Sequence, residues 1–212
     1  MRHHLILAGG GHTHALVLRM WAMGQVRRPA DTLVTLVNRH GTALYSGMVP
    51  AVVAGLHPRH ACAIDLRRLC GLAGVTFVQA EITGVAVAPR ELRLAGRPPL
   101  RFDRLSLDVG AVTVVPDGAR AVKPLEPFLD WALAARPAGG LRIRGGGAAA
   151  VELALAFRAR GIPCRLLLRG RSLRLGSASA ARAGERLLAE AGIPIEREVA
   201  PGTPADLACT GS

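Results

Sequence analysis

The sequence contains few aromatic residues: only 3% of its 212 positions are Phe, Trp or Tyr. Its core must therefore consist mainly of Leu, Val, Ala and Ile, and few rings are available to stack on nucleic-acid bases. Hydrophobic residues nevertheless make up 50% of the chain, which is enough to bury a sizeable core. The length is typical of one large domain or two small ones.

Other absences exclude further classes of protein. No apolar run reaches the ~18 residues of a membrane-spanning helix, and the run that precedes the first glycines is too short for a secretory signal. The four cysteines show no C-x-x-C spacing, so we expect reduced, structural thiols in a cytoplasmic protein. A G-x-S-x-G hydrolase motif is also missing. His12 and His14 are too close in sequence to share a helix face and no Cys or His spacing accompanies them, so no metal site is predicted.

Acidic residues are scarce relative to basic ones, 15 against 27, which gives a formal net charge of +12. Such a charge attracts polyanions. The basic residues are spread through every segment, however, and all except Lys123 are arginines. We therefore predict no specific nucleic-acid partner, only weak and salt-sensitive binding to polyanions.

What the chain does have is a glycine-rich turn near its start. An apolar run leads into glycines at 9–11, a segment with helical spacing follows, and a second apolar run lies at 33–37. This order is typical of a βαβ unit that binds a dinucleotide diphosphate. Gly9 would permit the tight turn, and Gly11 would let backbone N–H groups approach a phosphate at the helix N-terminus. The alternative is a turn without a ligand, because His14 replaces the usual third glycine and needs extra room or faces outward.

The predicted strand at 33–37 ends at Asn38 and Arg39, where an acidic residue usually binds the ribose hydroxyls. Asn38 can donate and accept hydrogen bonds, but it carries no charge. Arg39 could stack on an adenine or contact a phosphate, and the alternative is an exposed strand end.

The middle of the chain is predicted to continue the α/β pattern and to contain an inserted β-meander. Turn residues, including Pro98 and Pro99, separate its short strands. The expected helices lie at 49–54, 64–70 and 127–135, and the expected strands at 75–82, 84–88, 91–94 and 100–107.

The opening pattern returns near residue 141, where a short strand leads into three glycines and a helix. Ala150 stands in the third-glycine position, for which alanine is an accepted substitute. A strand at 164–169 completes a second βαβ unit, and a helix at 177–191 and a strand at 193–199 follow. Arg142 and Arg144 lie within the first strand of this unit. Burying two unpaired arginines is costly, so we expect a distorted or weakly folded second unit.

The predicted fold class is α/β, with two Rossmann-like dinucleotide-binding βαβ units and an inserted β-meander. The predicted division is an FAD-binding domain at 1–112, a connector at 113–140 and an incomplete NAD(P)-binding domain at 141–212. Two such motifs in one chain indicate two nucleotide cofactors, one a flavin and one a nicotinamide, with hydride transfer between them.

The chain resembles the pyridine nucleotide-disulfide oxidoreductase superfamily. Within it, the chain is most similar to the type II NADH dehydrogenase-like branch related to the form fused to selenide, water dikinase. The matching segments are GGGHTHA at 9–15, YSGMVP at 45–50, IDLRRLC at 64–70, FDRLSLDVG at 102–110, VKP at 122–124 and GGGAAAVELA at 145–154.

This resemblance implies an FAD-dependent oxidoreductase that passes a hydride from NAD(P)H to the flavin and on to a small-molecule acceptor, of which a quinone is one candidate. The residues implied in FAD binding are Gly9, Gly10, Gly11, His12, Asn38, Arg39, Glu81, Ile82, Asp108 and Gly110. Those implied in NAD(P)H binding are Gly145, Gly147, Ala150 and Arg169, of which Arg169 favours a 2′-phosphate. Glu152 is implied as the catalytic residue near the junction of flavin and nicotinamide, and the alternative is an ordinary acid in the first helical turn.

Members of this family normally continue beyond Ser212, so the resemblance implies a C-terminally truncated form. A nucleotide-binding remnant without turnover is therefore the alternative function. The choice between NADH and NADPH, contact with a membrane surface and formation of a homo-oligomer are left open.

Overall fold

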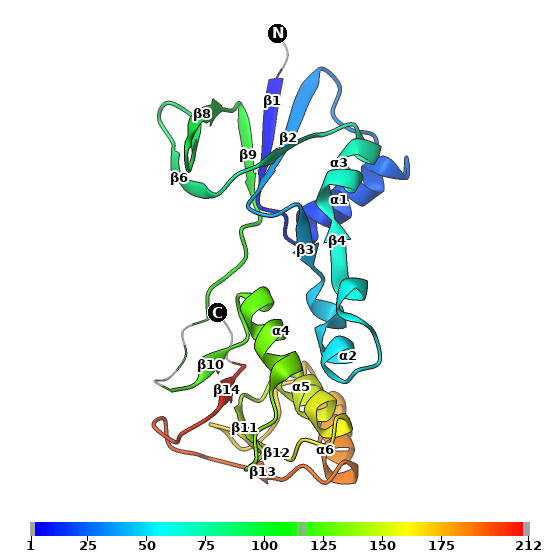
Figure 1. The fold of residues 1–212 in the computed structure, drawn as a ribbon, viewed down its shortest axis with the longest axis vertical. Helices are drawn as coiled ribbons and strands as arrows, with labels where there is room; N and C mark the ends of the chain where they lie inside the picture. The colour runs from blue at the N-terminus through cyan, green and yellow to red at the C-terminus, as the bar shows by residue number, and fades with distance from the viewer. Residues whose placement is uncertain (1–2, 114, 116–117, 210–212) are drawn as a thin grey trace. The chain divides into compact units, whose positions relative to one another are not determined.

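The chain forms two compact units in a computed structural model, which describes residues 3–113, 115 and 118–209 (Figure 1). The first unit consists of Met1–Tyr45 and Ala63–Gly110, and the second of Ser46–Cys62 and Ala111–Ser212. Residues 46–62 thus belong to the second unit, whereas the division predicted from the sequence placed them in the first. Both units have the α/β architecture expected from the sequence.

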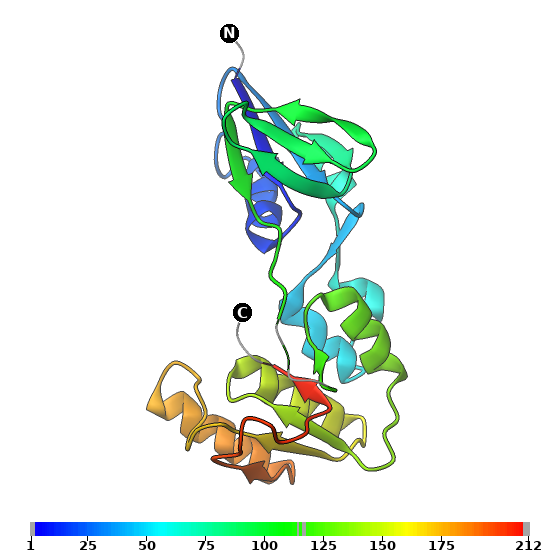
Figure 2. The same ribbon diagram turned by 90° about the vertical axis from the view of Figure 1, so that its left-hand side faces the viewer.

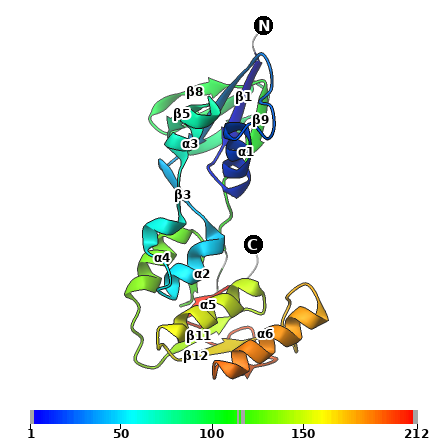
Figure 3. The same cartoon turned by 90° about the vertical axis from the view of Figure 1, so that its right-hand side faces the viewer.

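A parallel four-stranded sheet in the order β5-β2-β1-β9 forms the centre of the first unit. Its strands are β1 (His3–Ala8), β2 (Thr32–Asn38), β5 (Thr76–Gln79) and β9 (Arg104–Leu107). Successive side chains of β1 point to opposite faces. Leu7 packs with Leu18 and Leu66 of helices α1 (His12–Ala22) and α3 (Leu66–Ala73), and Figure 3 shows these helices together. Ile6 and Ala8 belong to a separate cluster on the other face.

That other face is covered by the predicted meander, an antiparallel sheet of β6 (Ile82–Ala86), β7 (Glu91–Leu94) and β8 (Arg97–Arg101) (Figure 2). Leu92 and Leu94 of β7 pack against the parallel sheet. The expected strand at 75–82 is in fact two strands, because Ile82 starts β6. Pro98 and Pro99 lie within β8 and not in turns; β8 is an edge strand, where a missing N–H is tolerated.

The predicted helix at 64–70 begins later than expected, because its first residues pair as a strand. β3 (Thr42–Leu44) and β4 (Ala63–Asp65) form an antiparallel pair. Asp65 is the N-cap of α3, and its side chain accepts a hydrogen bond of 2.9 Å from the backbone N–H of Arg68. A carboxylate at this position satisfies one of the free donors of the helix.

The second unit contains a parallel five-stranded sheet in the order β10-β14-β11-β12-β13. Short 3₁₀ turns at Ser46–Met48 and Arg59–Cys62 flank helix α2 (Val49–Val53). In the part of the chain that the structure describes, no helix is both long and apolar enough to cross a membrane. The helices are α2 (Val49–Val53), α4 (Leu125–Ala134), α5 (Ala148–Ala159) and α6 (Ala178–Glu190), and the strands are β10 (Arg120–Ala121), β11 (Leu141–Arg144), β12 (Cys164–Leu167), β13 (Ile195–Glu196) and β14 (Leu207–Ala208).

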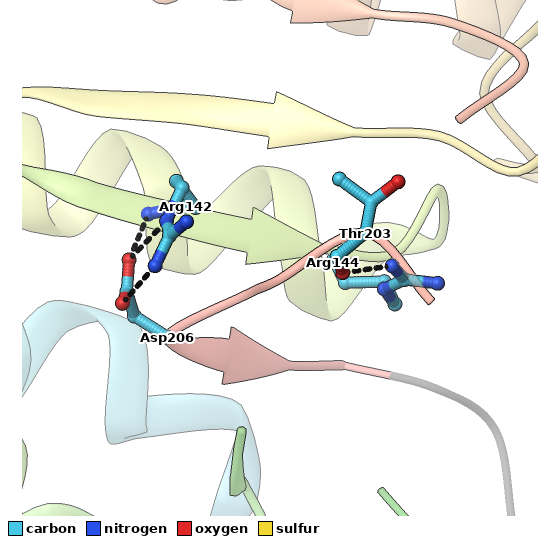
Figure 4. A network of polar contacts seen from close by, with 4 residues as sticks. All are labelled: Arg142, Arg144, Thr203 and Asp206. Carbon is cyan, nitrogen blue, oxygen red and sulfur yellow. Dashed lines mark hydrogen bonds and ion pairs between the residues drawn. The ribbon is translucent and has the colours of Figure 1, made fainter. Parts of the chain in front are cut away.

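The expected distortion of the second unit does not occur, because both strand arginines have partners (Figure 4). Arg142 is exposed and binds the Asp206 carboxylate through Nε and Nη2, at 3.1 and 3.0 Å. Arg144 is buried, and its guanidinium donates to the carbonyl oxygens of Pro201, at 2.8 Å, and Thr203. The loop before β14 thus supplies acceptors for the two terminal guanidinium nitrogens of Arg144, whereas its buried Nε has no hydrogen-bond partner among the described residues.

Candidate functional site

The first glycine turn, Gly9–Gly11, joins β1 to α1 and packs tightly against the segment that follows β9. Gly9 has a positive φ of 92°, and a Cβ there would lie 2.2 Å from the carbonyl oxygen of Asp108. A Cβ on Gly11 would lie 2.2 Å from Oδ1 of the Asp108 carboxylate. Both glycines therefore leave room for another part of the same chain. For Gly11 this differs from the predicted reason, which was the approach of a phosphate.

Asn38 is tied to this turn and not free at the strand end. Its side-chain oxygen accepts a hydrogen bond of 2.8 Å from the backbone N–H of Gly10, and its amide nitrogen donates to the carbonyl of His40 at 2.9 Å. Each of its two side-chain functions thus has a partner within the chain. Its predicted place at the adenosine end of the cofactor stays a prediction.

His14 fills the third-glycine position by facing inward, so of the two predicted alternatives, extra room or an outward-facing ring, the structure shows the first. The ring is 2% exposed; Nδ1 lies 2.7 Å from the carbonyl oxygen of Gly9, and Nε2 lies 2.8 Å from Oγ of Ser106. Because a carbonyl only accepts, Nδ1 donates to Gly9, and Nε2 forms its hydrogen bond with the Ser106 hydroxyl. The backbone N–H of His14 donates to Oδ2 of Asp108 at 3.1 Å.

Sequence reasoning missed this contact between Asp108 and the first turn of α1. The available signal was the spacing of Ser106 and Asp108, which places both on one face of an extended segment. The helix-proximal donors that remain are the backbone N–H groups of His12 and Thr13, for which no acceptor occurs among the described residues. The His12 ring stacks on Tyr45, with centroids 5.1 Å apart. Two free amides suit one phosphate, but the carboxylate of Asp108 opposes it.

The other residues predicted for the first site follow the carboxyl ends of their strands. Arg39 follows β2 and forms an ion pair with Glu81, which follows β5. Ile82 begins β6, and Gly110 is exposed with a φ of 77°. The structure thus brings Gly9, Gly10, Gly11, His12, Asn38 and Asp108 together and pairs Arg39 with Glu81.

The second glycine turn, Gly145–Gly147, is more open. A Cβ on Gly147 would have no atom within 4 Å, and no side chain caps α5. The first turn of α5 has no acidic residue, and no acceptor for the backbone N–H groups of Ala148 and Ala149 occurs in the described ranges. Ala150 is buried against Gly145, as a small third residue should be. This donor set fits a diphosphate better than the first turn does.

An arginine-containing cavity adjoins the second glycine turn. The backbone N–H of Arg174 donates to the carbonyl of Gly146 at 2.7 Å. Within the part of the chain that the structure describes, neither Arg174 nor Arg182 has a carboxylate partner, and Arg169 is exposed without one. Sequence reasoning singled out Arg169 and missed the other two. The cavity measures about 530 Å³ and is lined by residues 172–178, Ala181, Arg182 and Glu185.

Glu152, the predicted catalytic residue, is exposed in the second turn of α5, since Gly147 is the N-cap. The alternative interpretation as a first-turn acid is therefore wrong. No hydrogen bond or ion pair of its side chain occurs among the described residues, so none of these residues positions the carboxylate. Its catalytic role stays a prediction.

The cysteines lie in apolar surroundings. Burial raises the pKa of Cys70 and Cys164 to about 11 and that of Cys209 to about 12. All four are free thiols, and a raised pKa keeps a thiol protonated and unreactive at neutral pH. Over residues 3–113, 115 and 118–209, no group of three or more His, Cys, Asp or Glu side chains could hold a metal ion.

No family model and no curated protein sequence matches the chain, but many solved structures share its fold. Reduced CoADR-RHD from Bacillus anthracis has a TM-score of 0.79 at 15% identity over 100% of this chain and 44% of that one. NDH2 from Plasmodium falciparum in complex with NADH has a TM-score of 0.74 at 14% identity, covering 100% and 55%. The water-forming NADH oxidase from Lactobacillus brevis bound to NADH has a TM-score of 0.72 at 15% identity, covering 97% and 48%. The chain spans about half the length of these structures.

Proposed function

We propose that this chain acts as an FAD-dependent NAD(P)H oxidoreductase of the pyridine nucleotide-disulfide oxidoreductase superfamily. The observation that carries the proposal is the presence of two glycine turns in one chain, each between a parallel strand and a helix with free first-turn amides. Such helix N-termini attract diphosphates. The NADH-bound neighbours of similar fold support a nicotinamide nucleotide as one ligand.

In this proposal the chain holds and orients two nucleotides. The amides of His12 and Thr13 would receive the FAD diphosphate, and those of Ala148 and Ala149 the NAD(P)H diphosphate. When bound, FAD supplies the acceptance of a hydride from the nicotinamide. The chemistry that FAD would supply in this unit ends on a small-molecule electron acceptor, with a quinone as one candidate.

A visible absorbance spectrum tests the proposal. Purified protein is mixed with FAD, passed through gel filtration, and examined under anaerobic conditions before and after addition of NADH or NADPH. We expect the flavin absorbance to stay with the protein and to bleach with reduced nicotinamide. Protein that leaves the column colourless would overturn the proposal.

A nucleotide-binding protein without turnover is the second candidate function. The Asp108 carboxylate favours it, because it lies at the first glycine turn, where FAD should bind. In that case the protein would bind NADH or NADPH in a calorimeter, but no flavin would be retained or reduced. The absorbance spectrum and the calorimetric titration together distinguish the two functions.

A further inference from the structure

The Asp108 side chain lies where an anionic ligand of the first glycine turn would bind. Oδ2 accepts a hydrogen bond from the backbone N–H of His14, the third residue of α1, at 3.1 Å. Oδ1, Cγ and Oδ2 lie within 2.5 Å of the position that a Cβ of Gly11 would take. This is the face of Gly11 that must be bare for backbone to approach a diphosphate. The Asp108 carboxylate thus occupies the same face of Gly11 that the expected ligand would need.

No cationic side chain of the described residues forms an ion pair with this carboxylate. The ion pairs of the first unit are Arg39 with Glu81, Arg101 with Glu91, and a contact of 3.9 Å between His3 and Asp103. In the described ranges Asp108 takes part in none. Its compensation comes from the N–H of His14 and from the positive end of α1, which are the groups that would also stabilise a phosphate.

We propose that Asp108 is a built-in competitor for the first dinucleotide site, whose carboxylate occupies the helix N-terminus and lowers the affinity for a diphosphate. The inference rests on the proposed binding of FAD by the first unit. A diphosphate at the amides of His12 and Thr13 would share the first turn of α1 with the Asp108 carboxylate, which accepts from His14, and like charges about 4 Å apart repel even in water. Binding therefore has to displace the carboxylate or tolerate this repulsion.

The alternative is that Asp108 only caps α1, as Asp65 caps α3. The two roles differ in their dependence on charge, since a neutral amide or hydroxyl oxygen can also accept the hydrogen bond from His14. Asp108→Asn and Asp108→Ser keep an acceptor and remove the charge. Asp103→Asn is the matched control. The Asp103 carboxylate also accepts a hydrogen bond from a backbone N–H, that of His4 at 2.7 Å, but it lies at the N-terminal end of β1, whereas the glycine turn follows the C-terminal end.

The experiment measures dissociation constants of FAD, ADP and riboflavin for the wild-type chain and the three variants by titration calorimetry at low ionic strength. We expect D108N and D108S to bind FAD and ADP about fivefold more tightly than the wild type, which corresponds to the repulsion between two unit charges about 4 Å apart in water. Riboflavin has no phosphate, so its affinity should not change. D103N should bind all three ligands like the wild type.

Each other result has a defined meaning. Wild-type protein that binds FAD, with D108N and D108S binding it no more tightly, would overturn the competitor role and leave the proposed function standing. An equal gain for riboflavin or for D103N would also overturn it, because the effect would then not be a local repulsion of phosphate. Absence of FAD and ADP binding in the wild type and in both Asp108 variants would overturn the proposed function itself. Melting temperatures show whether a variant is folded. If D108N does not fold, D108S provides the test of the competitor role.

Discussion

His14 links the first glycine turn to the sheet, and its removal should weaken the first unit. The buried ring bonds the carbonyl of Gly9 and the hydroxyl of Ser106. His14→Ala would leave a cavity and an unpaired carbonyl, at a cost of about 2–4 kcal/mol in unfolding free energy. Ser106→Ala should cost about 1 kcal/mol, because it removes one hydrogen bond. Urea unfolding followed by Trp21 fluorescence in a W131F background measures both.

The double variant H14A/S106A provides the control for that prediction. If the two residues stabilise the fold through their shared hydrogen bond, the double variant should lose no more stability than H14A alone. Additive losses would show that the bond between the two side chains contributes nothing.

Arg174 should discriminate between the two nicotinamide nucleotides. It lines the cavity beside the second glycine turn, and its backbone donates to Gly146. A guanidinium in this region can accommodate a 2′-phosphate, so Arg174→Ala should weaken NADPH binding about tenfold and leave NADH binding unchanged. Calorimetric titration with both nucleotides measures the ratio.

Arg171→Ala is the matched control, because Arg171 already pairs with Glu198 at 2.9 Å. An equal loss for NADPH in R171A would indicate a general charge effect. An equal loss for NADH in R174A would place the guanidinium against a part of the nucleotide that both ligands share.

At the scale of elements, Asp206 links the start of β14 to β11, because its carboxylate accepts hydrogen bonds from the backbone N–H and the guanidinium of Arg142. Hydrogen bonding and charge from Arg142 hold the pKa of Asp206 below its usual value. Its contribution to unfolding free energy is therefore complete above the unfolded pKa of about 3.9 and is lost as pH falls through the lower folded pKa. Asp206→Asn should lower the melting temperature of the second unit by several degrees at pH 7, and by much less at pH values below that range.

Glu198→Gln serves as the control for that pH dependence, since the Glu198 side chain is 60% exposed and exposed pairs contribute little. A D206N deficit that stays constant from pH 7 to the acid range would contradict the ionic origin. Trp131 fluorescence, recorded in a W21F background, reports this unit because Trp131 lies in α4.

The elements that the sequence predicted best are those with local signals. Helices α1 and α5 follow glycines directly, and their apolar spacing is visible in the sequence. Strands β10 and β14 have two residues each and were not predicted, because they exist only through pairing with each other and with β11. The expected distortion of β11 failed for the same reason: the partner of Arg142 is Asp206, 64 positions away.

The candidate site likewise contains features that the sequence predicted and features that it did not. The backbone donors at each helix N-terminus follow from the glycine turns and could be predicted. The contact of the competing carboxylate was missed, because Asp108 and His14 are 94 positions apart and meet only when β9 pairs with β1, and the spacing of Ser106 and Asp108 was the one local signal for it. We expected a distorted or weakly folded second unit, whereas the structure shows that the second glycine turn is more open than the first.

For the whole molecule, the two compact units should respond to different ligands. Each unit has one tryptophan, Trp21 in α1 and Trp131 in α4. A ligand at 100 times its dissociation constant stabilises the state that it binds by about 2.7 kcal/mol. FAD should therefore raise the urea midpoint reported by Trp21 in W131F protein, and NADPH the midpoint reported by Trp131 in W21F protein.

Gly147→Asp supplies the matched variant for this experiment. A side chain there meets no atom within 4 Å, and an aspartate is a favourable N-cap, so the variant should fold. Its carboxylate would place beside α5 the same negative charge that Asp108 places beside α1. G147D should lose the NADPH-dependent shift of Trp131 and keep the FAD-dependent shift of Trp21. If both ligands shift only one of the two midpoints, or if G147D abolishes both shifts, the assignment of one nucleotide to each unit is wrong.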